Sequence, residues 1–258
     1  MDELLRKIRK LNWILQERGE GVFSFNELCE ILSTLMNANV YIMGRKGKVL
    51  GSHYVIREDS ATVIDPETGG EIVPNEYRNA LMEIEESIVN IQKEESMKYF
   101  SNEWKTYDKL NMLIPVYGGG QKLGVLIFAR YDEMFETSDV ILGEYSAAIM
   151  GVEIERRQNR EIENDVRRRA VVQMAIGTLS YTEIEAVQQI LSELKGCEGL
   201  VVASKIADRS KITRSVIVNA LRKLESAGVI ESRSLGMKGT HIRILNSQLK
   251  SELERLEM

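Results

Sequence analysis

Two amphipathic helical patterns open the chain. Apolar residues recur at helical spacing over 3–17, and the glycines of 19–21 should end that helix. A second helix is expected to start at Ser24, because Ser24 and Glu27 form a capping-box pattern. Its buried stripe should comprise Phe25, Leu28, Ile31, Leu32 and Leu35.

Strand-like patterns follow these helices. The apolar runs 40–43 and 48–51 flank a glycine-containing turn, which predicts two strands. Residues 60–70 are polar and contain glycine and proline, so we expect a loop there that could be mobile. A helix should follow Pro74, because a proline lacks the amide hydrogen that would be unpaired in a first helical turn.

A hairpin and a long helix complete this part of the chain. Apolar runs at 111–116 and 123–129 are joined by a glycine-rich turn typical of a β-hairpin. The pattern is then helical from 137 to 179, and its middle is densely charged with both signs, as in a connector or a dimer-forming helix. Strands bracketed by helices indicate an α+β fold with a mainly antiparallel sheet, the arrangement of GAF-type sensor domains. We therefore expect a sensor domain at 1–152 and a linker helix at 153–180.

The residues from 181 to 258 predict a second domain. Thr182 should cap a helix over 183–194. A helix over 201–209, a short turn and a helix over 214–227 follow, which is the frame of a helix-turn-helix. Thr213 is a good N-cap for the second of these helices, and Gly228 stands where a left-handed C-cap is needed.

The helix over 214–227 separates its residues by face. Ile217, Ala220, Leu221 and Leu224 should pack inward, and Arg214, Ser215, Val218, Asn219 and Arg222 should point outward together. Arg214 and Asn219 have donors for bidentate contacts with guanine and adenine, and Val218 could touch a thymine methyl group. This face therefore predicts base reading in a major groove.

The alternating runs 229–233 and 240–244 predict two strands, joined by a flexible basic loop. This loop with its two strands is a wing, and its Lys238 and Arg243 should add salt-sensitive contacts to phosphates.

The distribution of charge along the chain supports a nucleic-acid-binding module in the same region. From Leu200 to Lys250 the chain has ten basic and three acidic residues, a local charge of +7, whereas the whole chain carries −5. An acidic body with a basic module is expected when one domain meets nucleic acid.

The few cysteines and histidines of the chain argue against metal-binding and enzymatic functions. Cys29 and Cys197 have no metal-ligand or disulfide spacing, and His53 and His241 are the only histidines. We therefore expect no metal site, no cofactor-dependent chemistry and no enzyme. No stretch approaches a membrane span, and the N-terminus lacks the features of a signal peptide, so we expect a cytoplasmic protein.

Three segments carry a family resemblance. They are Ala-Val-Val-Gln-Met-Ala-Ile at 170–176, Ala-Ser-Lys-Ile-Ala-Asp-Arg at 203–209, and the continuous run 212–239. In these segments the chain closely resembles the CodY family, global nutritional regulators of low-GC Gram-positive bacteria, and weaker likeness extends over essentially the full length.

The resemblance implies a homodimer that binds an AT-rich palindromic operator on double-stranded DNA. In that family a GAF domain binds branched-chain amino acids, chiefly isoleucine, and in many members GTP, and effector binding strengthens repression of genes for amino-acid and nitrogen metabolism. The residues expected to contact DNA are Ala203, Ser204, Lys205, Thr213, Arg214, Ser215, Val218, Asn219, Arg222, Arg233, Ser234, Lys238 and Thr240.

The implied effector sites depart from the family pattern. The Phe-Pro-x-x-Tyr segment of the amino-acid pocket corresponds to Val73, Pro74 and Tyr77, and the arginine that clamps the ligand carboxylate has no clear counterpart near Arg57. The pocket is therefore either retained for isoleucine, or altered or lost. The GTP-binding residues implied by the resemblance are Gly44, Arg45, Lys46, Lys48, Glu153 and Ile154.

Two other functions compete with the DNA-binding regulator. A GAF-type enzyme would need paired acids or a histidine base in its pocket, and His53 has no obvious partner. A winged helix that docks protein instead of DNA would show no salt-dependent affinity for DNA.

Overall fold

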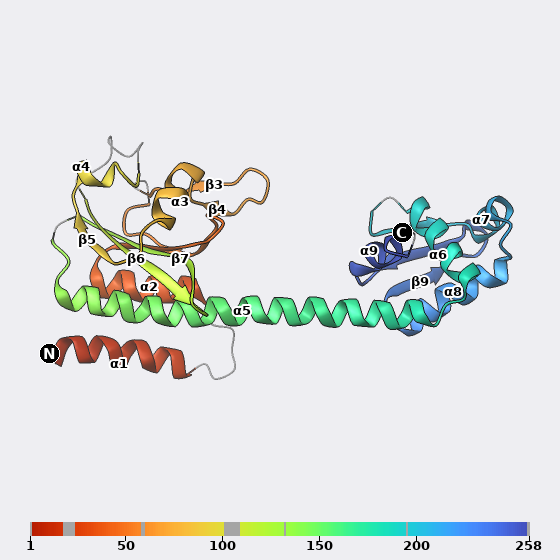
Figure 1. The fold of residues 1–258 in the computed structure, drawn as a ribbon, viewed down its shortest axis with the longest axis horizontal. Coiled ribbons are helices and arrows are strands. Elements are labelled where there is room, and N and C mark those ends of the chain that lie inside the picture. Colours follow the sequence, from red (N-terminus) through yellow and green to blue (C-terminus); the bar gives the residue numbers. More distant parts are fainter. Residues whose placement is uncertain are drawn as a thin grey trace. The chain divides into compact units, whose positions relative to one another are not determined.

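The computed structural model describes most of the chain, in two compact units (Figure 1). The described residues are 2–17, 24–57, 60–100, 109–131, 133–194 and 196–256. The units are Met1–Gln158 and Asn159–Met258. No helix within the described ranges combines the length and apolar character that a bilayer span requires.

The first unit is built on a five-stranded antiparallel sheet. Its strands are β1 (Asn39–Gly44), β2 (Val49–His53), β5 (Ile88–Ile91), β6 (Leu110–Gly118) and β7 (Gln121–Arg130), in the order β2-β1-β7-β6-β5. The two predicted strand pairs are confirmed. β5 has no counterpart in the prediction.

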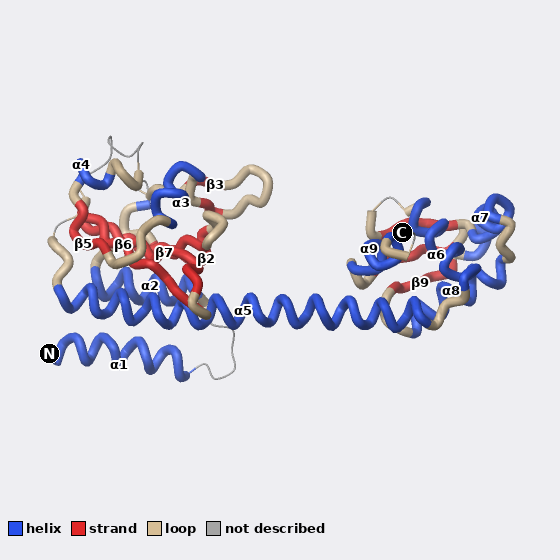
Figure 2. Tube along the Cα trace, in the orientation of Figure 1, coloured by secondary structure: helices blue, strands red, loops and turns tan. Residues whose placement is uncertain are grey.

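Helices lie on both faces of this sheet (Figure 2). They are α1 (Asp2–Glu17), α2 (Phe25–Met36), α3 (Asn75–Met82), α4 (Lys93–Ser96) and α5 (Thr137–Gly177). Side chains alternate across the strands, so Val40 and Ile42 of β1 pack with α1, α2 and α5, including the buried Cys29. Tyr41 and Met43 pack into a second apolar cluster with α3. The α+β arrangement with a mainly antiparallel sheet is thereby confirmed.

Local predictions for this unit hold in part. Helix α2 begins after Ser24 as expected, yet within residues 24–27 the Ser24 side chain makes no capping hydrogen bond. Asn37, in a left-handed conformation, ends the helix instead of a glycine. The predicted glycine break at 19–21 lies outside the described residues.

The segment 60–70, predicted as a loop, is part of a small hairpin. Strands β3 (Val63–Ile64) and β4 (Glu71–Ile72) pair in it, so the purely loop prediction was wrong. The Glu71 carboxylate stabilises this hairpin by accepting hydrogen bonds from the Ser52, Tyr54 and Thr62 hydroxyls, at 3.0, 2.7 and 2.5 Å. The Ser52 and Tyr54 hydroxyls belong to the end of β2 and the residue after it. The sequence of 60–70 alone therefore does not predict this hairpin.

Helix α5 contributes side chains to the core of each unit. Ile154 is buried in the first core, and Val172, Ala175 and Ile176 are buried in the second. Residues 158–169 between them are exposed, as the charged pattern predicts. At Gly151 the helix packs directly on β6, where an added Cβ would stand 1.9 Å from the Tyr117 carbonyl oxygen.

The second unit is a winged helix-turn-helix. Its elements are α6 (Tyr181–Glu193), β8 (Glu198–Val201), α7 (Ala203–Ser210), α8 (Arg214–Ser226), β9 (Ile230–Ser234), β10 (Thr240–Ile244) and α9 (Gln248–Glu254). Its sheet has the order β8-β10-β9. The helix predicted over 201–209 begins two residues later, because Val201 belongs to β8 and pairs with Thr240.

The start of α6 corrects another prediction. Ser180, not Thr182, is the N-cap: its hydroxyl accepts from the Glu183 amide at 3.3 Å, and Glu183 accepts from the Ser180 amide at 2.7 Å. Lys223 of α8 also donates to Glu183, at 2.7 Å. That lysine, followed by the Ser180 amide, holds the pKa of the Glu183 carboxyl below its usual value.

Candidate functional site

Helix α8 presents one buried and one exposed face, as its periodicity predicts. Ile217, Ala220, Leu221 and Leu224 are buried in the core of the second unit. The opposite face carries the exposed side chains of Arg214, Ser215, Val218, Asn219 and Arg222. Hydrogen-bond donors for phosphates and base edges therefore lie together along one side of this helix.

The start of α8 is shaped by the turn before it. Ile212 is buried and anchors that turn, while Lys211 adopts a left-handed conformation with φ +57°. Thr213 stands at the N-cap, but within the described segment 203–226 its hydroxyl makes no capping bond and instead lies 2.9 Å from the Ser215 hydroxyl. Thr213 is thus confirmed as the N-cap residue, but its hydroxyl does not make the expected capping bond, so no N-cap side chain within 203–226 covers the first amides of α8, which can accept an anion.

The other candidate DNA contacts flank this helix in the sequence. Ser204 and Lys205 are exposed in α7, and Ala203 is half-buried at its start. In the wing, Arg233, Ser234 and Lys238 are exposed, and Thr240 pairs with both Ser234 and Val201. Gly239 has φ +113°, and a Cβ there would stand 2.6 Å from the Val201 carbonyl oxygen, so the wing requires glycine at this point.

The residues implied for amino-acid binding lie in or beside the second apolar cluster of the first unit. Val73 and Tyr77 are buried there, and Pro74 is the N-cap of α3. The Tyr77 and Phe100 rings meet edge to face at 5.7 Å. Arg57 is exposed, with its guanidinium 5.8 Å from the centre of the Tyr54 ring.

The implied GTP-binding residues occupy the β1–β2 turn and α5. Arg45, Lys46 and Lys48 are exposed around a tight turn closed by Gly44. Glu153 pairs with Arg157 at 3.1 Å, and Ile154 is buried in the core. The β6–β7 turn lies between the two groups, because Gln121 accepts from Arg45 at 3.4 Å and an added Cβ at Gly119 would meet Glu155.

The contacts of Lys122 are not predictable from the sequence. From the start of β7 its ammonium group donates to the carbonyl oxygens of Leu81 and Met82, each at 3.1 Å, and to that of Ile84. It thereby caps the end of α3, which carries Tyr77. Partial burial lowers the pKa of Lys122, opposed by the nearby Glu85. No local pattern predicts this contact, because the carbonyl groups lie about 40 residues away.

The described residues contain no group of three or more His, Cys, Asp or Glu side chains arranged to hold a metal ion. His53 has a buried Nδ1 atom without a hydrogen-bond partner among the described residues.

Comparisons with known proteins agree in both halves of the chain. Residues 3–178 match the family model of the CodY GAF-like domain, and residues 197–257 match that of the CodY helix-turn-helix domain. The global transcriptional regulator CodY of Clostridium perfringens (strain SM101 / Type A) is 48% identical over 258 residues, with 100% of each chain covered. The protein of the same name from Thermoanaerobacter sp. (strain X514) is 51% identical over 257 residues, again with 100% of each chain covered.

One solved structure is similar to the first unit. It is the cofactor binding GAF domain of the nutrient sensor CodY from Clostridium difficile, with a TM-score of 0.50 and 36% sequence identity. The match covers 59% of this chain and 97% of that one.

Proposed function

The chain belongs to the CodY family of global transcriptional regulators, and from that premise we propose that it is a DNA-binding repressor of genes for amino-acid and nitrogen metabolism. It acts as a homodimer in the cytoplasm, on AT-rich palindromic DNA. Its working parts are a sensor domain at 1–152, a linker helix at 153–180 and a DNA-binding domain at 181–258.

The observation that carries this proposal is the exposed face of α8. Arg214, Ser215 and Asn219 stand clear of the core, and within the described part of this unit the N-cap side chain leaves the first amides of the helix available to a phosphate. The wing adds Arg233 and Lys238, both exposed. One surface thus supplies base-reading side chains and sequence-independent cations, the two components of specific DNA binding.

The effectors proposed are isoleucine or a related branched-chain amino acid, and GTP. The buried side chains of Val73, Tyr77 and Phe100 support an apolar binding site beside α3. The exposed cations of the β1–β2 turn support a phosphate site. Calorimetric titration of the full chain with isoleucine, valine, leucine and GTP tests both, and the absence of heat for all four would remove this part of the proposal.

Mobility shift on an AT-rich palindromic duplex, with and without isoleucine, tests DNA binding. Replacing Arg214 with alanine should weaken binding by about 1 to 3 kcal/mol if it reads a base. The Arg214→Ala, Ser215→Ala double variant should lose most specific binding. Arg160→Ala is the matched control, because it removes the same charge from the exposed middle of α5 and should leave binding nearly unchanged.

Undiminished binding by the double variant would contradict the proposal. A wild-type chain without any salt-dependent affinity for DNA would instead favour a winged helix that docks protein.

A further inference from the structure

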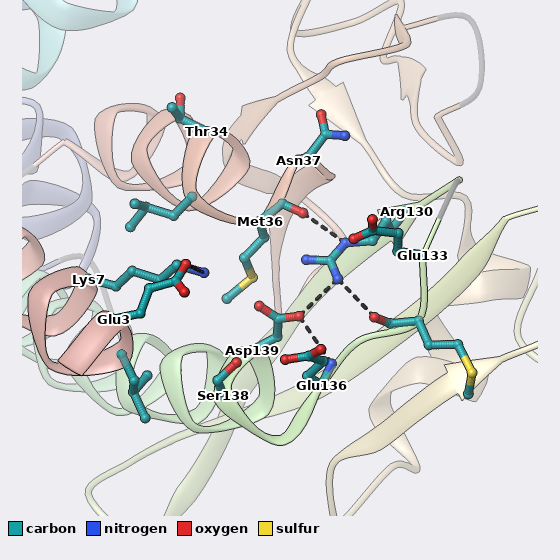
Figure 3. Close-up of a pocket in the computed structure, with 13 residues that line it drawn as sticks. Glu3, Lys7, Thr34, Met36, Asn37, Arg130, Glu133, Glu136, Ser138 and Asp139 are labelled. Atoms are coloured by element: carbon teal, nitrogen blue, oxygen red, sulfur yellow. Dashed lines mark hydrogen bonds and ion pairs between the residues drawn. The ribbon is translucent and has the colours of Figure 1, made fainter. Parts of the chain in front are cut away.

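A polar hollow of about 610 Å³ lies in the first unit, where α1, the end of α2 and the start of α5 meet (Figure 3). Its volume falls within the range of small-molecule sites, about 300 to 1,000 Å³. It is lined by Glu3, Leu4, Lys7, Thr34, Leu35, Met36, Asn37, Arg130, Glu133, Met134, Glu136, Ser138 and Asp139. The residues implied for isoleucine and GTP are not part of this lining.

A buried ion pair forms one wall of the hollow. The Arg130 guanidinium donates to Asp139 at 2.9 Å, and the two side chains are 9% and 7% exposed. Arg130 also donates from Nε to the Met36 carbonyl oxygen at 2.8 Å and from Nη1 to that of Met134 at 3.1 Å. The position of the guanidinium is therefore fixed by the fold rather than by a ligand.

Among the described residues, each member of this pair has one polar atom without a hydrogen-bond partner. No described residue accepts a hydrogen bond from Nη2 of Arg130, and none donates to Oδ1 of Asp139, whose Oδ2 accepts from Arg130 and from the Glu136 amide. Both residues belong to the lining of the hollow. Figure 3 shows Arg130 and Asp139 side by side, facing Glu3 and Lys7 of α1.

A cationic donor beside an anionic acceptor is complementary to a carboxylate beside an ammonium group. Charge-assisted hydrogen bonds of this kind are the stronger class in proteins. The α-carboxylate and α-ammonium of a free amino acid are held at that close spacing by a single carbon atom. The pair thus matches the invariant end of an amino acid, whatever its side chain.

The charge of the remaining lining residues determines which ligand side chain fits the hollow. It carries four carboxylates, Glu3, Glu133, Glu136 and Asp139, against the two cations Lys7 and Arg130, a net charge of −2. Glu133 and Glu136 are exposed at the rim. This charge disfavours phosphates and acidic ligands and favours a cationic side chain. We propose that the hollow is a binding site for a free basic amino acid, with its carboxylate on Arg130, its ammonium on Asp139 and its side chain towards Glu133 and Glu136.

Calorimetry on the full-length protein tests this site with L-arginine and L-lysine as probes. Both should bind, and excess isoleucine should not displace them. Agmatine, which is arginine without the carboxylate, should bind about tenfold more weakly or worse, because it cannot use Nη2 of Arg130. L-Glutamate should not bind.

Rim variants complete the test without disturbing the buried pair. Glu133→Gln with Glu136→Gln should weaken arginine binding by about tenfold, since it removes the charges that face the ligand side chain. Glu30→Gln with Glu86→Gln is the matched control, because it makes the same charge change at exposed positions outside the hollow and should leave binding unchanged.

Three results would overturn the proposal: no binding of arginine or lysine at millimolar concentration, displacement of either by isoleucine, or equal affinity in the rim and control variants. DNA binding does not enter this experiment, so failure of the regulator proposal and failure of this site are distinguishable.

Discussion

Lys211 joins α7 to α8 in a left-handed backbone conformation, with φ +57° and ψ +22°. A side chain disfavours this region because Cβ crowds the following carbonyl oxygen, at a cost of roughly 1 kcal/mol. The Lys211 side chain is exposed. The turn of the helix-turn-helix therefore stores a small strain at this residue.

Replacing Lys211 with glycine should raise the free energy of unfolding of the second unit by about 0.5 to 1 kcal/mol, because glycine adopts this conformation without the steric penalty. Urea denaturation followed by circular dichroism measures the change. Lys205→Gly, in the exposed helical part of α7, is the control and should lower stability by a similar amount. Destabilisation by both substitutions would show that the turn is not strained.

Individual capping residues were the least predictable feature at this scale. The sequence has two overlapping patterns, Ser180 with Glu183 and Thr182 with Glu185, and local chemistry does not choose between them. The structure chooses the first because Lys223 of α8 also bonds to Glu183. A partner 40 residues away thus decides where α6 begins.

At the scale of elements, fully buried strands and helices with one continuous apolar face were predictable. β1 is buried at all six positions, and α8 has a clean apolar stripe, so both appear plainly in the sequence. β5 and β8 are short and mostly half-buried or exposed, and they were missed. Their strand conformation depends on hydrogen bonds to β6 and β10, which the local residues do not encode.

The packing of α5 on β6 gives a prediction for one glycine. Gly151→Ala should destabilise the first unit by about 1 to 3 kcal/mol, because the new methyl group would overlap the Tyr117 carbonyl oxygen, which is backbone and cannot rotate away. Thermal and urea unfolding of the full chain measure this change.

Gly177→Ala on the same helix is the control. No atom lies within 4 Å of its added Cβ among the described residues, so the substitution should be neutral or stabilise the helix by up to about 1 kcal/mol. Equal effects of the two substitutions would contradict a close contact between α5 and β6 at Gly151.

At the scale of the molecule, the candidate DNA surface was predictable because most of it lies on one helix and one hairpin. Periodicity alone separates the buried and exposed residues of α8, and the +7 charge of 200–250 identifies the unit that carries them. The hollow beside Arg130 was not predictable. Its lining comes from α1, the end of α2, the end of β7 and the start of α5, which only the folded chain brings together.

The burial of Cys29 has a practical consequence for the whole chain. Cys29 is fully buried on the inner face of α2 and burial raises the pKa of its thiol, whereas Cys197 in the second unit is exposed. A colorimetric thiol reagent should therefore modify one sulfur at once and the second only as fast as the first unit opens. Immediate modification of both would contradict that burial. The rate at which Cys29 reacts thus reports how fast the first unit opens in the native chain, without any introduced label.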